Sequence, residues 1–221
     1  MTDRTHTILC YGDSNTWGFV PQTGERYPFD VRWTGVLQAG LGSRYRVIEE
    51  GLNARTTVWE DPIMPGRNGK EYLLPCLETH RPLDAVVLFL GINDLKKRYS
   101  ASPVDIARGV GFLIGMIDNK AYGRRGQPPK ILVLPPPLVG KLTDYEEMFE
   151  GAAEKSPRLS VRICEAAVTA GCEFLDITPL VATSERDGIH LEPEAHAALG
   201  RAVAQRIAAM LACADVPSLV E

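Results

Sequence analysis

Two short segments of the 221-residue chain carry side chains that together could perform nucleophilic catalysis. Gly12-Asp13-Ser14 places a serine directly after a short apolar run, and Asp187-Gly188-Ile189-His190 places a carboxylate three residues before an imidazole. A serine hydroxyl is a weak nucleophile at neutral pH and needs an adjacent base, usually an imidazole that a carboxylate orients. Asp187 and His190 can meet across one tight turn, which Gly188 makes easy. These residue types therefore favour attack by Ser14 with His190 as its base.

Each segment taken alone also has a plainer interpretation. Glycine, aspartate and serine are all common in turns, so residues 12–14 could form an ordinary turn. By itself, His190 could be a capping or surface histidine. The other three histidines are less well placed, because His6 is terminal, His80 precedes Arg-Pro in a polar stretch, and His196 falls within a predicted helix.

A third segment, Gly91-Ile92-Asn93-Asp94, offers a donor for developing negative charge. The amide of Asn93 follows a predicted strand, as Ser14 does. One such donor to an oxyanion is typically worth about 10²–10³ in rate. Residues 49–56 follow another predicted strand and offer backbone N–H groups at the same edge, although each segment alone is also consistent with an ordinary loop.

Short apolar runs alternate with longer amphipathic ones along the chain. Strands are predicted over residues 7–11, 46–49, 84–90, 130–134 and 173–176, and helices over residues 31–41, 103–118, 156–170 and from 192 to about 213. This alternation favours an α/β fold with a parallel sheet of about five strands and helices on both faces. Ligands of such sheets bind at the carboxyl ends of the strands, where Ser14 and Asn93 are predicted to lie.

No linker divides the sequence, so we expect a single domain over residues 1–221 with a frayed tail after about residue 213. Long irregular stretches are predicted over residues 17–30, 54–82 and 135–155, and such stretches usually belong to a binding site, a lid or an interface. Gly109, Gly111 and Gly115 fall within a predicted helix, where we expect them to allow close packing against a neighbouring element. Gly66-Arg67-Asn68-Gly69-Lys70 lacks the spacing of a phosphate loop and is predicted to be an exposed turn.

Composition excludes several classes of function. Lys plus Arg total 24 and Asp plus Glu total 28, for a net charge of −4, so no basic stripe predicts a nucleic-acid partner. No run of 18 apolar residues predicts a membrane span, and the N-terminus lacks signal-peptide features.

An odd number of cysteines without paired spacing argues against a disulfide framework and against a zinc site built from cysteines. We therefore expect reduced thiols and a cytoplasmic protein. The cysteines are Cys10, Cys76, Cys164, Cys172 and Cys213.

The three segments resemble the ordered blocks of the GDSL, or SGNH, hydrolase superfamily. Residues 11–18, 30–33 and 50–57 are similar to its bacterial arylesterase/acyltransferase branch. The resemblance covers most of the chain and implies a three-layer α/β/α sandwich with the flavodoxin-like SGNH hydrolase fold. Members of the branch hydrolyse short acyl esters without a metal or organic cofactor. Some transfer the acyl group to alcohols or hydrogen peroxide, and they can form oligomers.

The resemblance also implies a role for each matching residue. Ser14 would be the nucleophile, His190 the general base and then acid, and Asp187 the group that orients His190. The oxyanion hole would use the backbone N–H of Ser14, the side chain of Asn93 and one further N–H. Alignment on Asn-Ala-Arg-Thr makes that third donor Ala54, which we favour, whereas alignment on Glu-Gly-Leu-Asn makes it Gly51.

The residues near these blocks suggest a substrate pocket. Aromatic side chains in loops can line a pocket, although local packing explains them equally well. Where the superfamily often has an apolar residue after the serine, this chain has Asn15, which predicts a more polar pocket wall. The pocket is expected to use Asn15, Trp17, Phe19, Trp59, Ile92 and Ile189.

The expected partners are a small-molecule ester and a water or alcohol acceptor. The same machinery could also deacetylate carbohydrates or cleave thioesters, and an alternative of another class is a non-catalytic ligand-binding α/β domain. The long irregular stretches hold more apolar residues than solvated loops need, which predicts either a lid or the interface of a homo-oligomer. These residues are Ile63, Met64, Leu73, Leu74, Leu138 and Met148.

Overall fold

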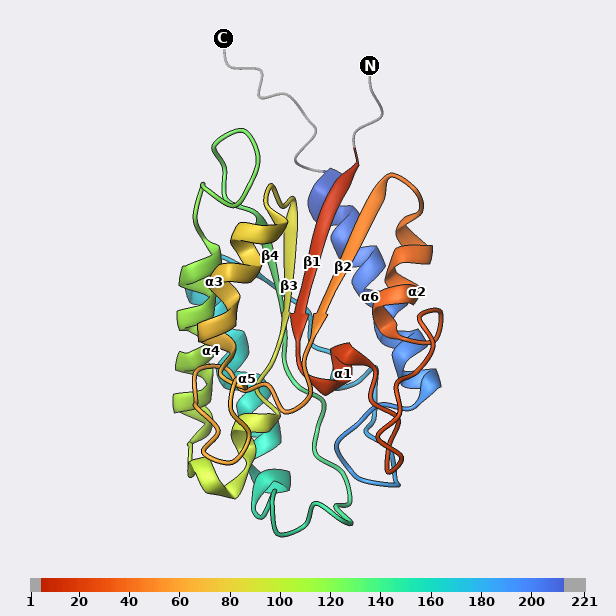
Figure 1. Ribbon diagram of the computed structural model, residues 1–221, viewed down its shortest axis with the longest axis vertical. Coiled ribbons are helices and arrows are strands. Elements are labelled where there is room, and N and C mark those ends of the chain that lie inside the picture. Colours follow the sequence, from red (N-terminus) through yellow and green to blue (C-terminus); the bar gives the residue numbers. More distant parts are fainter. Residues whose placement is uncertain (1–4, 213–221) are drawn as a thin grey trace.

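A five-stranded parallel sheet forms the centre of the computed structural model, which describes residues 5–212 (Figure 1). The strand order is β2-β1-β3-β4-β5, and every neighbouring pair is parallel. The fold class predicted from sequence is therefore confirmed, while the predicted frayed end after residue 213 lies outside the described residues. The strands are β1 (His6–Gly12), β2 (Tyr45–Gly51), β3 (Ala85–Phe89), β4 (Lys130–Leu134) and β5 (Glu173–Phe174).

Helices cover both faces of the sheet and complete a three-layer sandwich (Figure 1). Successive side chains of a strand point to opposite faces. In β1, Ile8 and Cys10 therefore pack toward α2 and α6, whereas Leu9 and Tyr11 pack toward α3, α4 and α5. The helices are α1 (Ser14–Trp17), α2 (Trp33–Leu41), α3 (Gly69–His80), α4 (Pro103–Ile117), α5 (Ala152–Thr169) and α6 (Pro193–Ala212).

The helix α3 occupies part of the predicted irregular stretch 54–82, so that prediction was wrong there. Asn68 caps this helix by accepting a hydrogen bond from the Lys70 N–H, at 3.1 Å. Residues 66–70 are thus a turn that leads into a helix, and Asn68 and Gly69 are buried rather than exposed. None of the helices within residues 5–212 has the length and apolar character needed to cross a membrane.

Of the helices predicted over residues 103–118 and 156–170, only the first begins where predicted. Ser102 caps α4, where its hydroxyl and the Asp105 side chain form a reciprocal capping box. In contrast, α5 begins at Ala152, one turn before Ser156. The Ser156 hydroxyl accepts a hydrogen bond from the Val139 N–H, at 3.1 Å, and so anchors the preceding loop instead of capping the helix.

Candidate active site

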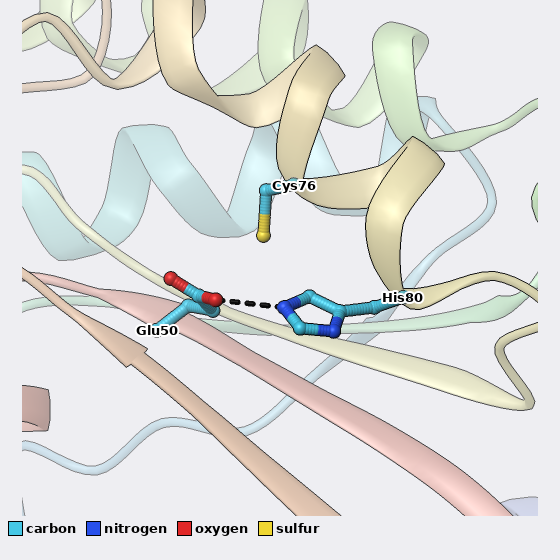
Figure 2. A group of neighbouring side chains, drawn as sticks. All are labelled: Glu50, Cys76 and His80. Atoms are coloured by element: carbon cyan, nitrogen blue, oxygen red, sulfur yellow. Dashed lines mark hydrogen bonds and ion pairs between the residues drawn. The ribbon is translucent and has the colours of Figure 1, made fainter.

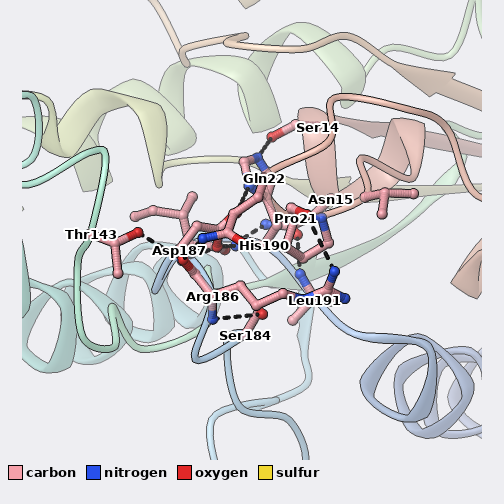
Figure 3. Close-up of polar contacts among 12 residues, drawn as sticks. Ser14, Asn15, Pro21, Gln22, Thr143, Ser184, Arg186, Asp187, His190 and Leu191 are labelled. Atoms are coloured by element: carbon pink, nitrogen blue, oxygen red, sulfur yellow. Dashed lines mark hydrogen bonds and ion pairs between the residues drawn. The ribbon is translucent and has the colours of Figure 1, made fainter.

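The structure brings Ser14, His190 and Asp187 into contact in series, although 176 residues separate the first two (Figure 3). Ser14 lies just beyond the carboxyl end of β1, at the start of α1, and His190 lies in the loop before α6. His190 Nε2 is 3.0 Å from Ser14 Oγ, and His190 Nδ1 is 2.7 Å from Asp187 Oδ2. This is the sequence of contacts that activation of a serine hydroxyl requires.

The Asp187 carboxylate is fixed by its own turn. Its Oδ1 accepts hydrogen bonds from the N–H groups of Ile189 and His190, at 2.9 and 3.0 Å, while its Oδ2 faces the His190 ring. Burial alone would raise the pKa of Asp187, but these hydrogen bonds and the His190 charge lower it below its ordinary value. Asp187 is therefore held as an anion that can orient the imidazole and stabilise its protonated form.

Gly188 is required at the centre of this turn. Its φ of +73° lies in the left-handed region, and a Cβ at this position would come within 2.5 Å of the Lys141 carbonyl oxygen. The Gly188 carbonyl also accepts a hydrogen bond from the Gly140 N–H, at 2.8 Å. The turn that carries His190 is thus packed directly against the loop that follows β4.

Asn15 joins the serine segment to the histidine segment. Its side-chain amide donates to the Ile189 carbonyl, at 3.3 Å, and its Oδ1 accepts from the Leu191 N–H, at 3.1 Å (Figure 3). The side chain is only 1% exposed. The prediction of a polar pocket wall formed by Asn15 is therefore corrected, because its polar atoms bond the backbone on both sides of His190.

Asn93 contacts the loop after β2, and that loop is hydrogen-bonded to Gly12 at the end of β1, two residues before Ser14. Asn93 Nδ2 donates to the Arg55 carbonyl, at 3.1 Å, so the amide lies against residues 54–55. Ala54 adopts a φ of +65°, and its N–H makes no hydrogen bond within residues 5–212. In contrast, Gly51 belongs to β2 and packs under α1, where a Cβ would lie 2.1 Å from the Trp17 nitrogen. An unpaired N–H on this loop supports Ala54 over Gly51 as an oxyanion donor.

Asp13 and Asp94 hold the loops on which these donors lie. Asp13 accepts a hydrogen bond from the Asn15 N–H, at 2.9 Å, and Asp94 accepts from the Thr57 N–H and hydroxyl. Both carboxyls are buried, and desolvation raises the pKa of Asp13 to about 7 and that of Asp94 to about 6. These contacts give both carboxyl groups a structural role in their loops.

Two aromatic rings border the His190 imidazole. The Phe19 ring stacks on it with a centroid separation of 4.2 Å, and the Tyr145 ring meets it edge-on at 6.0 Å. Trp17 lies behind Phe19, at 6.4 Å, with the Arg26 guanidinium over its indole ring. Tyr145 was missed from the sequence, since it lies in an irregular stretch without a motif.

Three other residues predicted to line the pocket are placed differently. Ile92 and Ile189 are buried in the core on the α3–α5 side of the sheet, with 0% and 2% exposure, so neither offers surface to a ligand in this structure. Trp59 packs partly against the same core, and its carbonyl accepts a hydrogen bond from the Thr56 hydroxyl. The predictions for Ile92 and Ile189 are corrected because both side chains are buried in the core, whereas that for the half-buried Trp59 stays a prediction.

A polar contact at Arg186 ties three loops together next to the triad (Figure 3). The Arg186 carbonyl accepts hydrogen bonds from Gln22 Nε2, at 3.0 Å, and from the Thr143 hydroxyl, at 2.7 Å. The Arg186 guanidinium pairs with the Glu192 carboxylate. The loops that follow β1 and β4 are thereby fastened to the loop that carries Asp187 and His190.

The comparisons with known proteins agree with this geometry. The GDSL-like lipase/acylhydrolase family model matches residues 10–198, whereas no curated protein matches the chain. The carbohydrate acetylesterase Est24 from Sinorhizobium meliloti is 41% identical, with a TM-score of 0.89 over 93% of this chain and 100% of that one. An aryl esterase from M. smegmatis is 39% identical, with a TM-score of 0.89 over 93% of this chain and 99% of that one. The chain therefore belongs to the GDSL-like lipase/acylhydrolase family.

Proposed function

We propose that this protein is a serine esterase that hydrolyses short-chain carboxylic esters through an acyl-enzyme. The observation that carries the proposal is the continuous contact from the Ser14 hydroxyl through the His190 imidazole to the Asp187 carboxylate. The similar structures described as an aryl esterase and a carbohydrate acetylesterase support the same reaction class. Catalytic roles for Ser14, His190 and Asp187 are part of this proposal.

The reaction follows from the donor and acceptor roles of these atoms. His190 Nε2 accepts the Ser14 proton as the serine oxygen attacks the ester carbonyl, and Asp187 stabilises the imidazolium that forms. His190 then gives the proton to the departing alcohol, which leaves the acyl group on Ser14. A water molecule or a second alcohol attacks the acyl-enzyme, and His190 again acts as base and then as acid.

Three donors are proposed to hold the oxyanion of each tetrahedral intermediate. They are the N–H groups of Ser14 and Ala54 and the side-chain amide of Asn93. One hydrogen of the Asn93 side-chain amide is donated to the Arg55 carbonyl, which leaves its second hydrogen for the oxyanion. Loss of one such donor typically lowers the rate by about 10²–10³.

Acyl transfer to alcohols is the second activity that a specific observation favours. Phe19 and Tyr145 cover parts of the His190 ring, and apolar cover limits the access of water to the acyl-enzyme. An alcohol with an apolar chain would contact these rings, whereas water would not. The proposal is tested by the ratio of ester exchange to hydrolysis when an alcohol is added to an aryl acetate assay.

A Ser14→Ala variant tests the esterase proposal directly. Its turnover of an aryl acetate is expected to fall about 10⁴-fold or more, because removing the nucleophile leaves only binding and the oxyanion donors. Ser160→Ala removes another buried serine, on α5, and is expected to keep full activity. Wild-type turnover by Ser14→Ala, with circular dichroism showing an intact fold, would refute the proposal.

A substrate panel separates the remaining candidates. An aryl acetate, an acetylated sugar and an acyl thioester at equal concentration distinguish the esterase, the carbohydrate deacetylase and the thioesterase. A stoichiometric covalent adduct of an organophosphate on Ser14 would exclude a non-catalytic binding domain. We propose that the aryl or alkyl ester is turned over fastest, since the aromatic rings beside His190 suit an apolar leaving group.

We also propose that the protein forms a homo-oligomer. Several of the apolar residues noted in the sequence are exposed, including Ile63 at 72% and Leu74 at 48%. Leu73 is an exception, because it faces the core from α3. Exposed apolar side chains just before and within α3 add apolar surface that an isolated monomer would leave in water. This surface supports an interface between copies.

We place the protein in the cytoplasm. The cysteines that the structure describes, Cys10, Cys76, Cys164 and Cys172, are all free thiols. Free thiols persist in a reducing compartment, which supports this location. Localisation of a tagged full-length chain in cell fractions tests it.

A further inference from the structure

Glu50, Cys76 and His80 form a cluster that the proposed esterase mechanism does not use (Figure 2). Glu50 lies near the carboxyl end of β2, and the other two lie on α3. Cys76 and His80 are four residues apart, which places them on the same face of the helix. One donor atom of each residue, a carboxylate oxygen, the sulfur and an imidazole nitrogen, lies within 4.8 Å of the others.

We propose that Glu50, Cys76 and His80 bind a divalent cation of the zinc class. A thiolate, an imidazole and a carboxylate are the three donor types that zinc accepts from proteins, and soft sulfur disfavours magnesium or calcium. Three protein ligands leave a fourth position for water. The cysteine spacing in the sequence could not indicate this site, because only one of its ligands is a cysteine.

The present geometry needs only small side-chain shifts to accept an ion. Zinc bonds to nitrogen, oxygen and sulfur are about 2.0–2.3 Å long, so neighbouring tetrahedral ligands lie roughly 3.3–3.7 Å apart. His80 Nε2 and Glu50 Oε1 are now 2.7 Å apart in a hydrogen bond, which an ion would replace by widening the gap. The Cys76 sulfur points toward the same pair from α3 (Figure 2).

Charged groups near the cluster act in both directions. The Glu50 carboxylate attracts a cation to the cluster. The nearby Arg55 guanidinium opposes the cation and limits its affinity. Cys76 is only 1% exposed, whereas His80 and Glu50 are partly exposed, which leaves an approach from solvent.

The site is connected to the serine loop through Arg55. Its Nη1 donates to the Gly12 carbonyl, at 2.8 Å, and also to the Glu50 carbonyl. None of the three proposed ligands hydrogen-bonds Ser14, Asp187 or His190 in the part of the chain that the structure describes. We therefore assign the ion a structural role that stabilises β2 against α3, without a step in ester hydrolysis.

Cobalt and zinc titrations of the full-length, chelator-treated and reduced protein test the proposal. Co²⁺ is expected to bind at one equivalent and to give a thiolate-to-cobalt charge-transfer band together with the visible bands of a tetrahedral site. Zn²⁺ is expected to displace it. At zinc concentrations about 100-fold above Kd, the melting temperature should rise by roughly 5–10 °C.

Matched variants assign the ligands. Cys76→Ser is expected to abolish the charge-transfer band, and His80→Gln to weaken binding at least tenfold, whereas Cys164→Ser and His190→Gln leave both unchanged. His80 is partly exposed, so His80→Gln keeps the test decisive even if Cys76→Ser unfolds. The proposal is overturned by the absence of saturable binding, by a charge-transfer band that survives in Cys76→Ser, or by one that disappears in Cys164→Ser.

Discussion

Replacing Asn15 by alanine tests whether this side chain positions the His190 imidazole. The variant removes one hydrogen bond to the Ile189 carbonyl and one from the Leu191 N–H. Leaving a buried polar group without its partner costs about 1–3 kcal/mol, so the two groups together should cost roughly 2–6 kcal/mol of unfolding free energy. A globular domain is stable by about 5–15 kcal/mol, so circular dichroism at 25 °C checks that the variant is folded before its activity is compared.

The same change should lower kcat more than it changes KM. His190 lies between the two backbone groups that Asn15 bonds, and its Nε2 reaches Ser14 Oγ at 3.0 Å. A displacement of about 1 Å in a reacting group can cost about 100-fold in rate. Partial release of this loop should therefore reduce kcat by roughly 10- to 100-fold.

The assay combines urea unfolding with steady-state hydrolysis of an aryl acetate. Ser102→Ala serves as the control, because it removes the cap of α4 and costs about 1 kcal/mol without touching the triad. Asn15→Asp keeps the acceptor for the Leu191 N–H but faces the Ile189 carbonyl with a second acceptor, so it should lose nearly as much activity. If Asn15→Ala lost stability but kept wild-type kcat, Asn15 would have no role in positioning His190.

Three further predictions concern pH, substrate preference and assembly. Burial raises the pKa values of Asp13 and Asp94 above their unfolded values, so the folded state retains protons that the unfolded state releases. The free energy of unfolding should therefore fall as pH rises from about 4 to about 7, and Asp13→Asn should flatten this dependence in urea unfolding. Trp17→Ala should change the preference among acyl chain lengths more than it changes the melting temperature, because Trp17 packs behind the Phe19 ring beside His190. Light scattering at micromolar concentration should give a multiple of the chain mass, because Ile63 and its apolar neighbours are exposed.

Each of these three predictions would be contradicted by a specific outcome. A free energy of unfolding that rises between pH 4 and 7 would mean that other groups dominate the titration of the two buried carboxyls. An equal loss of activity by Trp17→Ala for every ester, in proportion to a lower melting temperature, would indicate local packing only. A monomeric mass in light scattering would exclude the oligomer.

The parallel sheet could be predicted because its strands are short apolar runs with clear ends. The last helix was also predictable, since Leu199, Val203, Ile207 and Leu211 recur at steps of four and all are buried. In contrast, α3 was missed because it begins at Gly69, shortly after Gly66, and contains Pro75. Glycine and proline usually interrupt helices. Tertiary packing of Leu73 and Leu77 into the core overrides these local signals.

The contacts among Ser14, Asp187 and His190 were more predictable than the surroundings of the site. Asp187 and His190 are joined by a local turn, and Ser14 and Asn93 follow strands whose carboxyl ends must meet at one edge of a parallel sheet. The contact of Tyr145 with His190 depends on how the loop after β4 folds back, which no local pattern records. Asn15 was misplaced for a related reason, because its partners lie about 175 residues away in the chain.

The loops around the triad, which border the space for a substrate, are joined to one another. In the loop that carries Asp187 and His190, the Arg186 carbonyl accepts hydrogen bonds from Gln22 and Thr143. The three loops that border the triad are therefore joined by hydrogen bonds. A residue change in one of these loops can therefore also alter the position of the others. Structures described as an aryl esterase and as a carbohydrate acetylesterase share this fold with the same TM-score of 0.89. We therefore expect substrate preference in this fold to depend on the loops rather than on the sheet.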